Sequence, residues 1–148
     1  MMKSMVRVGT VSDRDSELCA VRVILPDQDD LVTDWLPVVV PQALNTRDFS
    51  LPDIDETVVC VFLGSGVEAG FCLGAIYTDA QAAGNENQRG VWFPDGSQVI
   101  FDHATGNLTV IAKGSVIITA PSTMINGNVR VTGNLVVDGS ITRGGVSI

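Results

Sequence analysis

Few residues in this 148-residue chain have the chemistry of a catalytic or metal site. The single histidine, His103, follows Asp102, and neighbouring residues of a strand point to opposite faces, so this carboxylate would not orient the imidazole. No second histidine is available for a metal site, and a single histidine without spatial information does not support a Ser–His–Asp arrangement. We therefore predict no catalytic residue and no metal ligand, and we interpret His103 as a turn or surface residue.

Two acidic clusters resemble cation sites in composition only. Asp27, Asp29 and Asp30 lack the glycine and the closing glutamate of a calcium-binding loop, so we expect a solvated turn there. The acidic residues at positions 53–56 have the same deficiency. We interpret them as a second surface turn, with a role in docking or metal binding as the less favoured alternative.

The three cysteines, Cys19, Cys60 and Cys72, have neither the even number of a disulfide framework nor the CxxC spacing of a zinc site. Each lies in an apolar run, which predicts core thiols in a protein made in a reducing cytosol. The glycine-containing run at residues 64–66 is not followed by Gly-Lys-Ser/Thr, so we expect no phosphate-binding loop. We predict no cofactor.

Charge divides the chain in two. Lys and Arg number 9 and Asp and Glu number 17, which gives a net charge of −8. Residues 1–90 hold 6 basic and 14 acidic residues, whereas residues 91–148 hold 3 of each. We therefore predict domains at residues 1–80 and 91–148, joined by a polar linker at residues 81–90. A chain this acidic does not neutralise phosphates, so nucleic acid is not an expected partner.

The composition is that of a folded protein. Hydrophobic residues make up 45% of the chain and charged residues 18%, which excludes a disordered chain. No run approaches the ~20 apolar residues of a membrane-spanning helix. The first residues also lack the pattern of a signal peptide, so we expect none.

Residues 1–80 are predicted to form a small all-β barrel. Short β-branched and apolar runs are separated by Gly, Pro and Asp, and no helical periodicity exceeds about one turn. Such a series of short strands is typical of a closed barrel, of which the OB-fold is the commonest. Residues 57–63 are apolar on both faces, which predicts burial on both sides, and Gly74 is expected at a bulge. The expected strands span residues 5–12, 17–25, 35–40, 57–63 and 71–77.

Residues 125–141 carry the strongest pattern in the chain. Odd positions are apolar or glycine and even positions are mostly polar, which is the period of a strand with one dry face. The phrase Gly-[Asn/Ser]-aliphatic-x-aliphatic occurs five times, and we predict that its glycines make turns between short strands. The copies begin at Gly106, Gly114, Gly127, Gly133 and Gly139; the last three begin six residues apart, and the last copy has Arg143 at its second aliphatic position.

A single ribbon of this kind leaves its apolar stripe and its strand edges open. Three identical chains around one axis would bury the stripe and pair the edges, so we predict a homotrimeric, intertwined triple-stranded β-helix, or β-prism. An ordinary antiparallel sandwich is one alternative. A left-handed β-helix of the hexapeptide acyltransferase kind is another, although such an enzyme needs more contiguous turns and a catalytic histidine. The predicted axis residues are Val129, Val131, Leu135, Val137 and Ile141.

Several motifs occur in the order found in one family. They are TDWL at residues 33–36, PDIDETV at 52–58, GFCLGAIY at 70–77 and, as the strongest, FPDGS at 93–97 followed by IFD at 100–102 and GNLTV at 106–110. With these motifs the chain resembles, over nearly its whole length, the baseplate assembly protein V family, the central spike of contractile phage tails and R-type pyocins.

This resemblance implies a homotrimer at the tip of a phage tail or phage-tail-like particle, made in the cytoplasm of the bacterial host. The barrels would form a collar that contacts tail-tube and baseplate proteins. The prism would pierce the bacterial outer membrane when the sheath contracts, and no bond would be made or broken. Collar and prism would join at Trp92, Phe93, Pro94, Asp95 and Gly96.

The sequence departs from the family after the last hexad. Spikes of the family often close with a His-x-His apex in which three chains hold an iron ion, and no histidine follows His103 here. We therefore expect no apex metal, and we expect the chain to be truncated or capped by another protein. The alternative function is an OB-fold module that binds a protein or a glycan, with a β-appendage and no piercing role.

Overall fold

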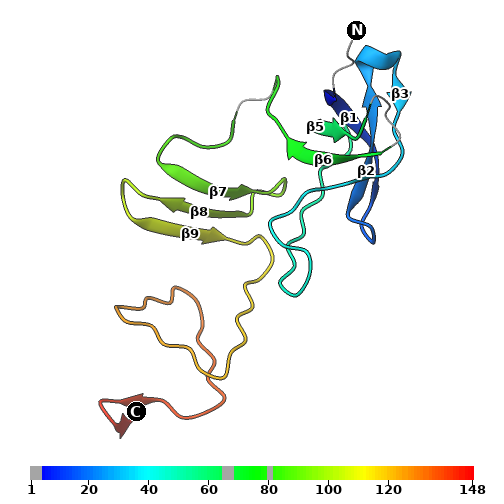
Figure 1. Ribbon diagram of the computed structural model, residues 1–148. Helices are drawn as coiled ribbons and strands as arrows, with labels where there is room; N and C mark the ends of the chain where they lie inside the picture. Colours follow the sequence, from blue (N-terminus) through cyan, green and yellow to red (C-terminus); the bar gives the residue numbers. More distant parts are fainter. Residues whose placement is uncertain (1–4, 65–68, 80–81) are drawn as a thin grey trace.

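The computed structural model describes residues 5–64, 69–79 and 82–148, and this part of the chain is almost entirely β-structure and loops (Figure 1). One short 3-10 helix, η1 (Pro26–Gln28), interrupts the strands. Within the described ranges no helix has the length and hydrophobicity to span a membrane. The turn expected at residues 64–66 falls mostly outside these ranges.

The first six strands form a closed barrel. Antiparallel ladders join them in the order β3-β2-β1-β5-β6, and β4 pairs with the other end of β2. The chain after β4 then reaches β6, because Val38 forms a parallel bridge with Cys72 and the Val39 amide donates to the Cys72 carbonyl at 2.9 Å. The circuit β1-β2-β4-β6-β5 is therefore closed, as the sequence predicted for an OB barrel. The strands are β1 (Val6–Asp15), β2 (Ala20–Leu25), β3 (Leu31–Val32), β4 (Leu36–Pro37), β5 (Thr57–Phe62) and β6 (Gly70–Ala75).

Alternate residues of these strands fill the barrel. Small and branched side chains dominate the interior, as a five-stranded barrel requires. The prediction that residues 57–63 are buried on both sides is wrong: Val58, Cys60 and Phe62 are buried, but Val59 and Val61 are half-buried on the outer face. The reason is that no helix among the described residues covers this face of the barrel. The core consists of Val11, Val21, Val23, Leu25, Leu36, Val58, Cys60, Phe62 and Cys72.

Local irregularities adjust the strands to the barrel. Opposite β5 the register shifts so that Val59 pairs with Gly74 and Cys60 with Cys72, which leaves Leu73 as the extra residue of a bulge. Gly74 has a φ of +137°, a conformation that favours glycine, and the predicted bulge is confirmed. The cysteines are free, as predicted. Cys60 and Cys72 are buried, but Cys19 lies half-buried in the β1–β2 turn, because that end of the strand pair leaves the core.

One charged side chain lies inside the barrel wall. Arg7 on β1 has a side chain only 5% exposed, and its Nη1 donates to Asp27 Oδ2 at 2.9 Å. Asp27 belongs to the predicted solvated turn, which is exposed as expected, but its carboxylate has the additional role of neutralising Arg7.

A three-stranded antiparallel sheet follows the barrel, in the order β7-β8-β9. It consists of β7 (Gln88–Trp92), β8 (Gln98–Asp102) and β9 (Asn107–Ile111). β7 begins inside the segment expected to be a linker. The predicted junction residues, Trp92 to Gly96, lie at the end of β7 and in the β7–β8 turn.

The β7–β8 turn is held by Asp95. Its carboxylate accepts the Ser97 amide at 2.8 Å and the Ser97 hydroxyl at 3.1 Å, and the Ser97 Oγ in turn accepts the Lys113 amide at 3.1 Å. The two hydrogen bonds from Ser97 lower the pKa of Asp95 below its ordinary value of 3.8. The turn thereby fixes the point at which the distal segment leaves the sheet.

Residues 112–141 contain neither helix nor strand. The sequence predicted period-two strands here, and the reason for the difference is that a strand is defined by a paired neighbour, which this single chain does not supply. A short hairpin ends the chain, in which β10 (Thr142–Arg143) pairs with β11 (Val146–Ser147) across Gly144 and Gly145, both with positive φ.

We predict that Asp27→Asn destabilises the barrel by about 1–3 kcal/mol, because it leaves the buried Arg7 guanidinium without its anionic partner. Asp53→Asn, the matched control, removes the partner of the 40% exposed Arg14 side chain and should cost less than about 0.5 kcal/mol. Urea unfolding followed by tryptophan fluorescence measures both. Equal losses for the two variants would contradict the role assigned to Arg7.

We also predict that Ser97→Ala raises the pKa of Asp95 towards 3.8, because one of the two Ser97 hydrogen bonds to the carboxylate is lost. Since the pKa is depressed in the folded state, the turn gains stability from this carboxylate above about pH 4 and loses it as the pH falls through the folded-state value. An NMR titration of the side-chain carboxyl carbon measures the shift. Ser115→Ala is the control and should leave the titration of Asp95 unchanged.

Candidate functional site

The three-stranded sheet has one face that no described residue covers. The ladders place Val91, Val99 and Val110 in one row, and Phe101 and Leu108 in the next row. These five side chains are between 46% and 67% exposed. We call them the apolar sheet face. Arg89 completes the second row and is the one charged residue there.

The opposite side of the same sheet is partly covered. Ile100 is buried there, and the indole of Trp92 lies against Gly84, where an added Cβ would meet the ring at 2.8 Å. Trp92 therefore packs the sheet onto the segment that leads to it from the barrel. The other four expected junction residues lie in the hairpin turn, and the junction role of all five residues stays a prediction.

The predicted axis residues all lie in the distal segment and are exposed. Val129, Val131, Leu135, Val137 and Ile141 are between 43% and 68% exposed, and the described part of the chain brings no element against them. In Figure 1 this segment runs away from the sheets as an open trace. Apolar side chains exposed in this number on a single chain mark an interaction surface.

The predicted turn glycines all lie where the backbone changes direction. Gly106 is in the β8–β9 turn with a φ of +75°, and Gly114, Gly127, Gly133 and Gly139 lie at bends. No atom lies within 4 Å of a Cβ added at any of them, so within one chain these glycines are not required by close packing. Their role at an axis stays a prediction.

The outer face of the barrel carries a second uncharged surface, which the sequence analysis did not single out. Val8 on β1 and Phe71 and Leu73 on β6 are exposed, and the half-buried Val59 and Val61 of β5 lie between them. Alternation along each strand was visible in the sequence. Which outward residues become neighbours depends on the ladder register, which the sequence alone did not supply.

The chemical candidates of the sequence are separated in the structure. His103 lies exposed in the β8–β9 turn, and its amide donates to the Asn87 carbonyl at 3.0 Å. Searched over the described ranges, the chain has no group of three His, Cys, Asp or Glu side chains arranged to hold a metal ion.

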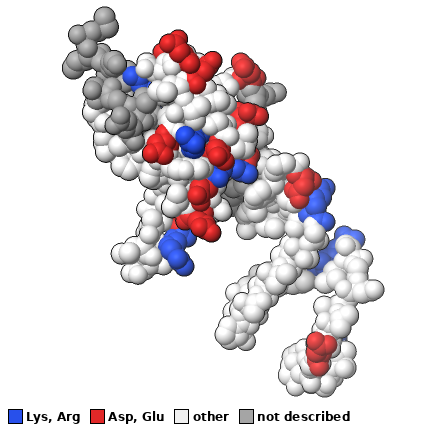
Figure 2. All heavy atoms as spheres, turned by 90° about the vertical axis from the view of Figure 1, so that its right-hand side faces the viewer, with Lys and Arg blue, Asp and Glu red and all other residues white. Residues whose placement is uncertain are grey.

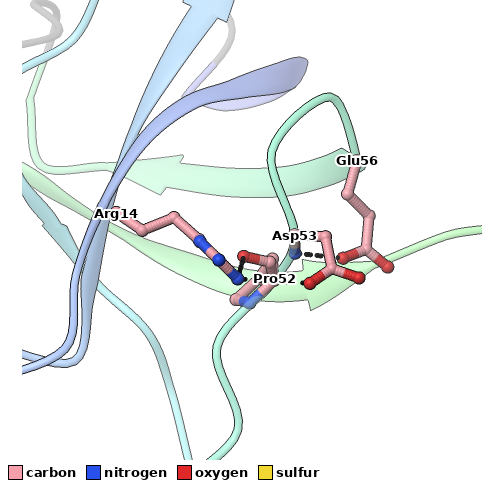
Figure 3. A network of polar contacts seen from close by, with 4 residues as sticks. All are labelled: Arg14, Pro52, Asp53 and Glu56. Carbon is pink, nitrogen blue, oxygen red and sulfur yellow. Dashed lines mark hydrogen bonds and ion pairs between the residues drawn. The ribbon is translucent and has the colours of Figure 1, made fainter. Parts of the chain in front are cut away.

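The acidic cluster at residues 53–56 holds a loop in place (Figure 3). Arg14 Nη1 donates to Asp53 Oδ1 at 3.2 Å and to the Pro52 carbonyl at 3.4 Å, while Glu56 Oε2 accepts the Asp53 amide at 2.7 Å. The Asp53 carboxylate thus fastens the long loop after β4 to β1, and the Glu56 carboxylate closes a turn within that loop. This geometry favours the interpretation as a surface turn.

Charge is separated along the molecule. Figure 2 shows acidic side chains concentrated over the barrel, while the distal segment is mostly uncharged. The barrel therefore repels polyanions, and the apolar sheet face and the distal segment are suited to contacts that exclude water.

Comparison with known proteins agrees with this geometry. Residues 7–77 match the family model of the Type VI secretion system/phage-baseplate injector OB domain. The spike protein of Escherichia phage P2 is 27% identical over 141 residues, which covers 88% of this chain and 65% of that protein. The chain thus spans slightly less than two thirds of this relative's length. With the closed OB barrel at the matched residues, these findings support the phage-baseplate spike family that the sequence motifs indicated.

Proposed function

We propose that the chain is the homotrimeric tip of a contractile injection system, in which the barrels form a collar and the distal segment forms a rod that pierces the outer membrane of the target bacterium. Similarity to phage-baseplate and spike proteins supports a structural role at the tail tip. The trimer, the rod and the piercing are the parts that we infer.

The single observation that carries this proposal is the position of the repeated phrase in β9. Leu108 and Val110 are the two aliphatic residues of its first copy, and both lie on the apolar sheet face. Val129 and Val131 occupy the same positions in a later copy. If later copies also become strands, their aliphatic side chains extend the same face along the molecule.

Identical copies are the occupant that this surface fits best. A face that continues through repeated phrases of one chain is matched in length and spacing by a second and third copy of itself. The outer edges of β7 and β9 have no strand partner among the described residues, and neighbouring copies would supply the missing backbone hydrogen bonds. The same assembly would then bury the apolar sheet face and pair the outer edges of β7 and β9.

The barrel would connect this rod to the rest of the particle. Its uncharged surface over β1, β5 and β6 offers a docking site for tail-tube or baseplate proteins. The acidity of the barrel as a whole disfavours nucleic acid as a partner. We propose neither catalysis nor a cofactor. The proposed work is mechanical, and the protein would act in an assembled particle after synthesis in the host cytoplasm.

The uncharged outer face of the barrel also supports a second candidate, an OB module that binds a protein or glycan while the chain remains monomeric. Under this alternative the distal segment is an appendage without a piercing role. The oligomeric state separates the two candidates directly. Light scattering of the full chain should give three times the mass of one chain for the spike and a single chain mass for the module.

We predict that Val131→Asp abolishes the trimer, whereas Thr132→Asp leaves it intact. Val131 belongs to the proposed axis, where three buried carboxylates would each cost several kcal/mol, and Thr132 belongs to the outer face. Light scattering and the resistance of the trimer band to SDS measure the effect.

The pair is informative because both side chains are exposed in the single chain. In a monomer, therefore, both aspartates should be tolerated equally. Equal behaviour of the two variants, whether both assemble or both fail, would contradict the assignment of the odd positions to the axis.

A further inference from the structure

Two of the free cysteines face each other inside the barrel. Cys60 on β5 and Cys72 on β6 are direct cross-strand partners, and both are fully buried. The sequence predicted core thiols at these positions without pairing them, and eleven residues lie between the two. The register that makes them partners is set by the bulge at Leu73. Neither the OB fold nor the proposed spike function requires thiols at these positions.

The ladder shows which kind of pair they form. The Leu63 amide donates to the Ala69 carbonyl at 2.8 Å, so the residues at 63 and 69 are a hydrogen-bonded pair. Such pairs alternate along an antiparallel ladder, and three steps further the residues at 60 and 72 are a non-hydrogen-bonded pair. The Cys72 carbonyl agrees with this, because it points away from β5 and accepts the Val39 amide.

A non-hydrogen-bonded pair brings its residues close together. The Cα atoms of such a pair lie about 4.5 Å apart, which is inside the range that a disulfide bridges. The two thiols are already in contact through a hydrogen bond. This bond and burial raise the pKa of Cys60, whereas the same bond and the Gly74 amide lower the pKa of Cys72.

We propose that Cys60 and Cys72 are a modification site, at which an intrachain disulfide forms between β5 and β6 when the protein meets an oxidising environment. The oxidant is a low-molecular-weight disulfide. The Cys72 thiolate attacks it, forms a mixed disulfide and releases one small thiol. The Cys60 sulfur, losing its proton, then attacks the Cys72 sulfur and releases the second small thiol.

The reaction is balanced in electrons and protons. The two cysteines lose two electrons together, the small disulfide is reduced to two thiols, and these take up the two cysteine protons. Because both sulfurs are buried, the first attack needs a local opening of β6. The reaction is therefore slow in the native barrel and becomes faster in mild denaturant.

The disulfide would tie together two adjacent strands of the barrel. In a reducing cytosol both thiols stay reduced, so assembly is unaffected, and the bond forms only after release. That timing rests on the proposed function, since a spike acts outside the cell in which it is made. The chemistry of the pair depends only on the barrel and holds for a monomer as well.

The test uses the full chain carrying Cys19→Ser, which removes the half-buried third thiol. After incubation with oxidised glutathione across urea concentrations below the unfolding midpoint, acid-quenched samples are analysed by intact mass and by peptide mapping. We expect the mass to fall by two hydrogens and a cross-linked peptide to contain residues 60 and 72. The doubly substituted control, Cys19→Ser with Cys60→Ser, should instead accumulate a stable glutathione adduct at Cys72.

Two outcomes would overturn the proposal. One is a persistent glutathione adduct in the chain that retains both cysteines, because it would mean that the sulfurs do not reach each other. The other is the recovery of both thiols unreacted at every urea concentration below the midpoint. Light scattering on the same samples reports the oligomeric state separately, so a failed trimer and a failed disulfide are distinguished.

Discussion

The constraint on which this molecule depends is that every strand edge and every apolar face needs a neighbour. The barrel meets it within one chain. The segment after β4 contacts both β2 and β6, so the barrel closes and its core is sealed. The distal half does not meet it: β7 and β9 keep an open edge in the described structure, and the apolar sheet face is exposed. One chain therefore combines a barrel that completes its own strand pairing with a distal half whose strand edges and apolar sheet face have no neighbour in the described structure.

Sequence patterns were sufficient for the barrel because they are local there. Each of the five expected strands overlaps an observed strand, since β-branched alternation and the Gly, Pro and Asp turns between runs are determined within a few residues. What the sequence missed depends on register. Strand β3, which has two residues, and the Cys60–Cys72 pair follow from which residues lie opposite each other across strands. The half-buried outer side of β5 follows instead from the lack of a covering layer among the described residues. Register depends on bulges and on closure of the barrel, and neither is set by a single strand.

The second half shows the complementary limit. The sequence predicted turns at the glycines of the repeated phrase, and the chain turns or bends at each of them, because glycine favours turns through local backbone freedom. The sequence did not determine whether the residues between the bends form strands, because hydrogen-bonded pairing is a property of two chains or two segments. The same argument applies to the candidate site. The identity of the apolar residues was available from the sequence, whereas their gathering on one face required the β7-β8-β9 ladders.

A comparison of two copies of the repeated phrase makes this dependence concrete. Residues 106–110 and 127–131 share the glycine, the asparagine and two aliphatic positions, yet the first copy continues from its glycine into strand β9 and the second contains no strand. Local propensity does not separate them, since both contain the same turn and β-branched chemistry. The difference is that β9 has β8 beside it. A pattern that becomes a strand wherever a neighbour is present, and repeats where the chain provides none, is best accounted for by neighbours from identical chains.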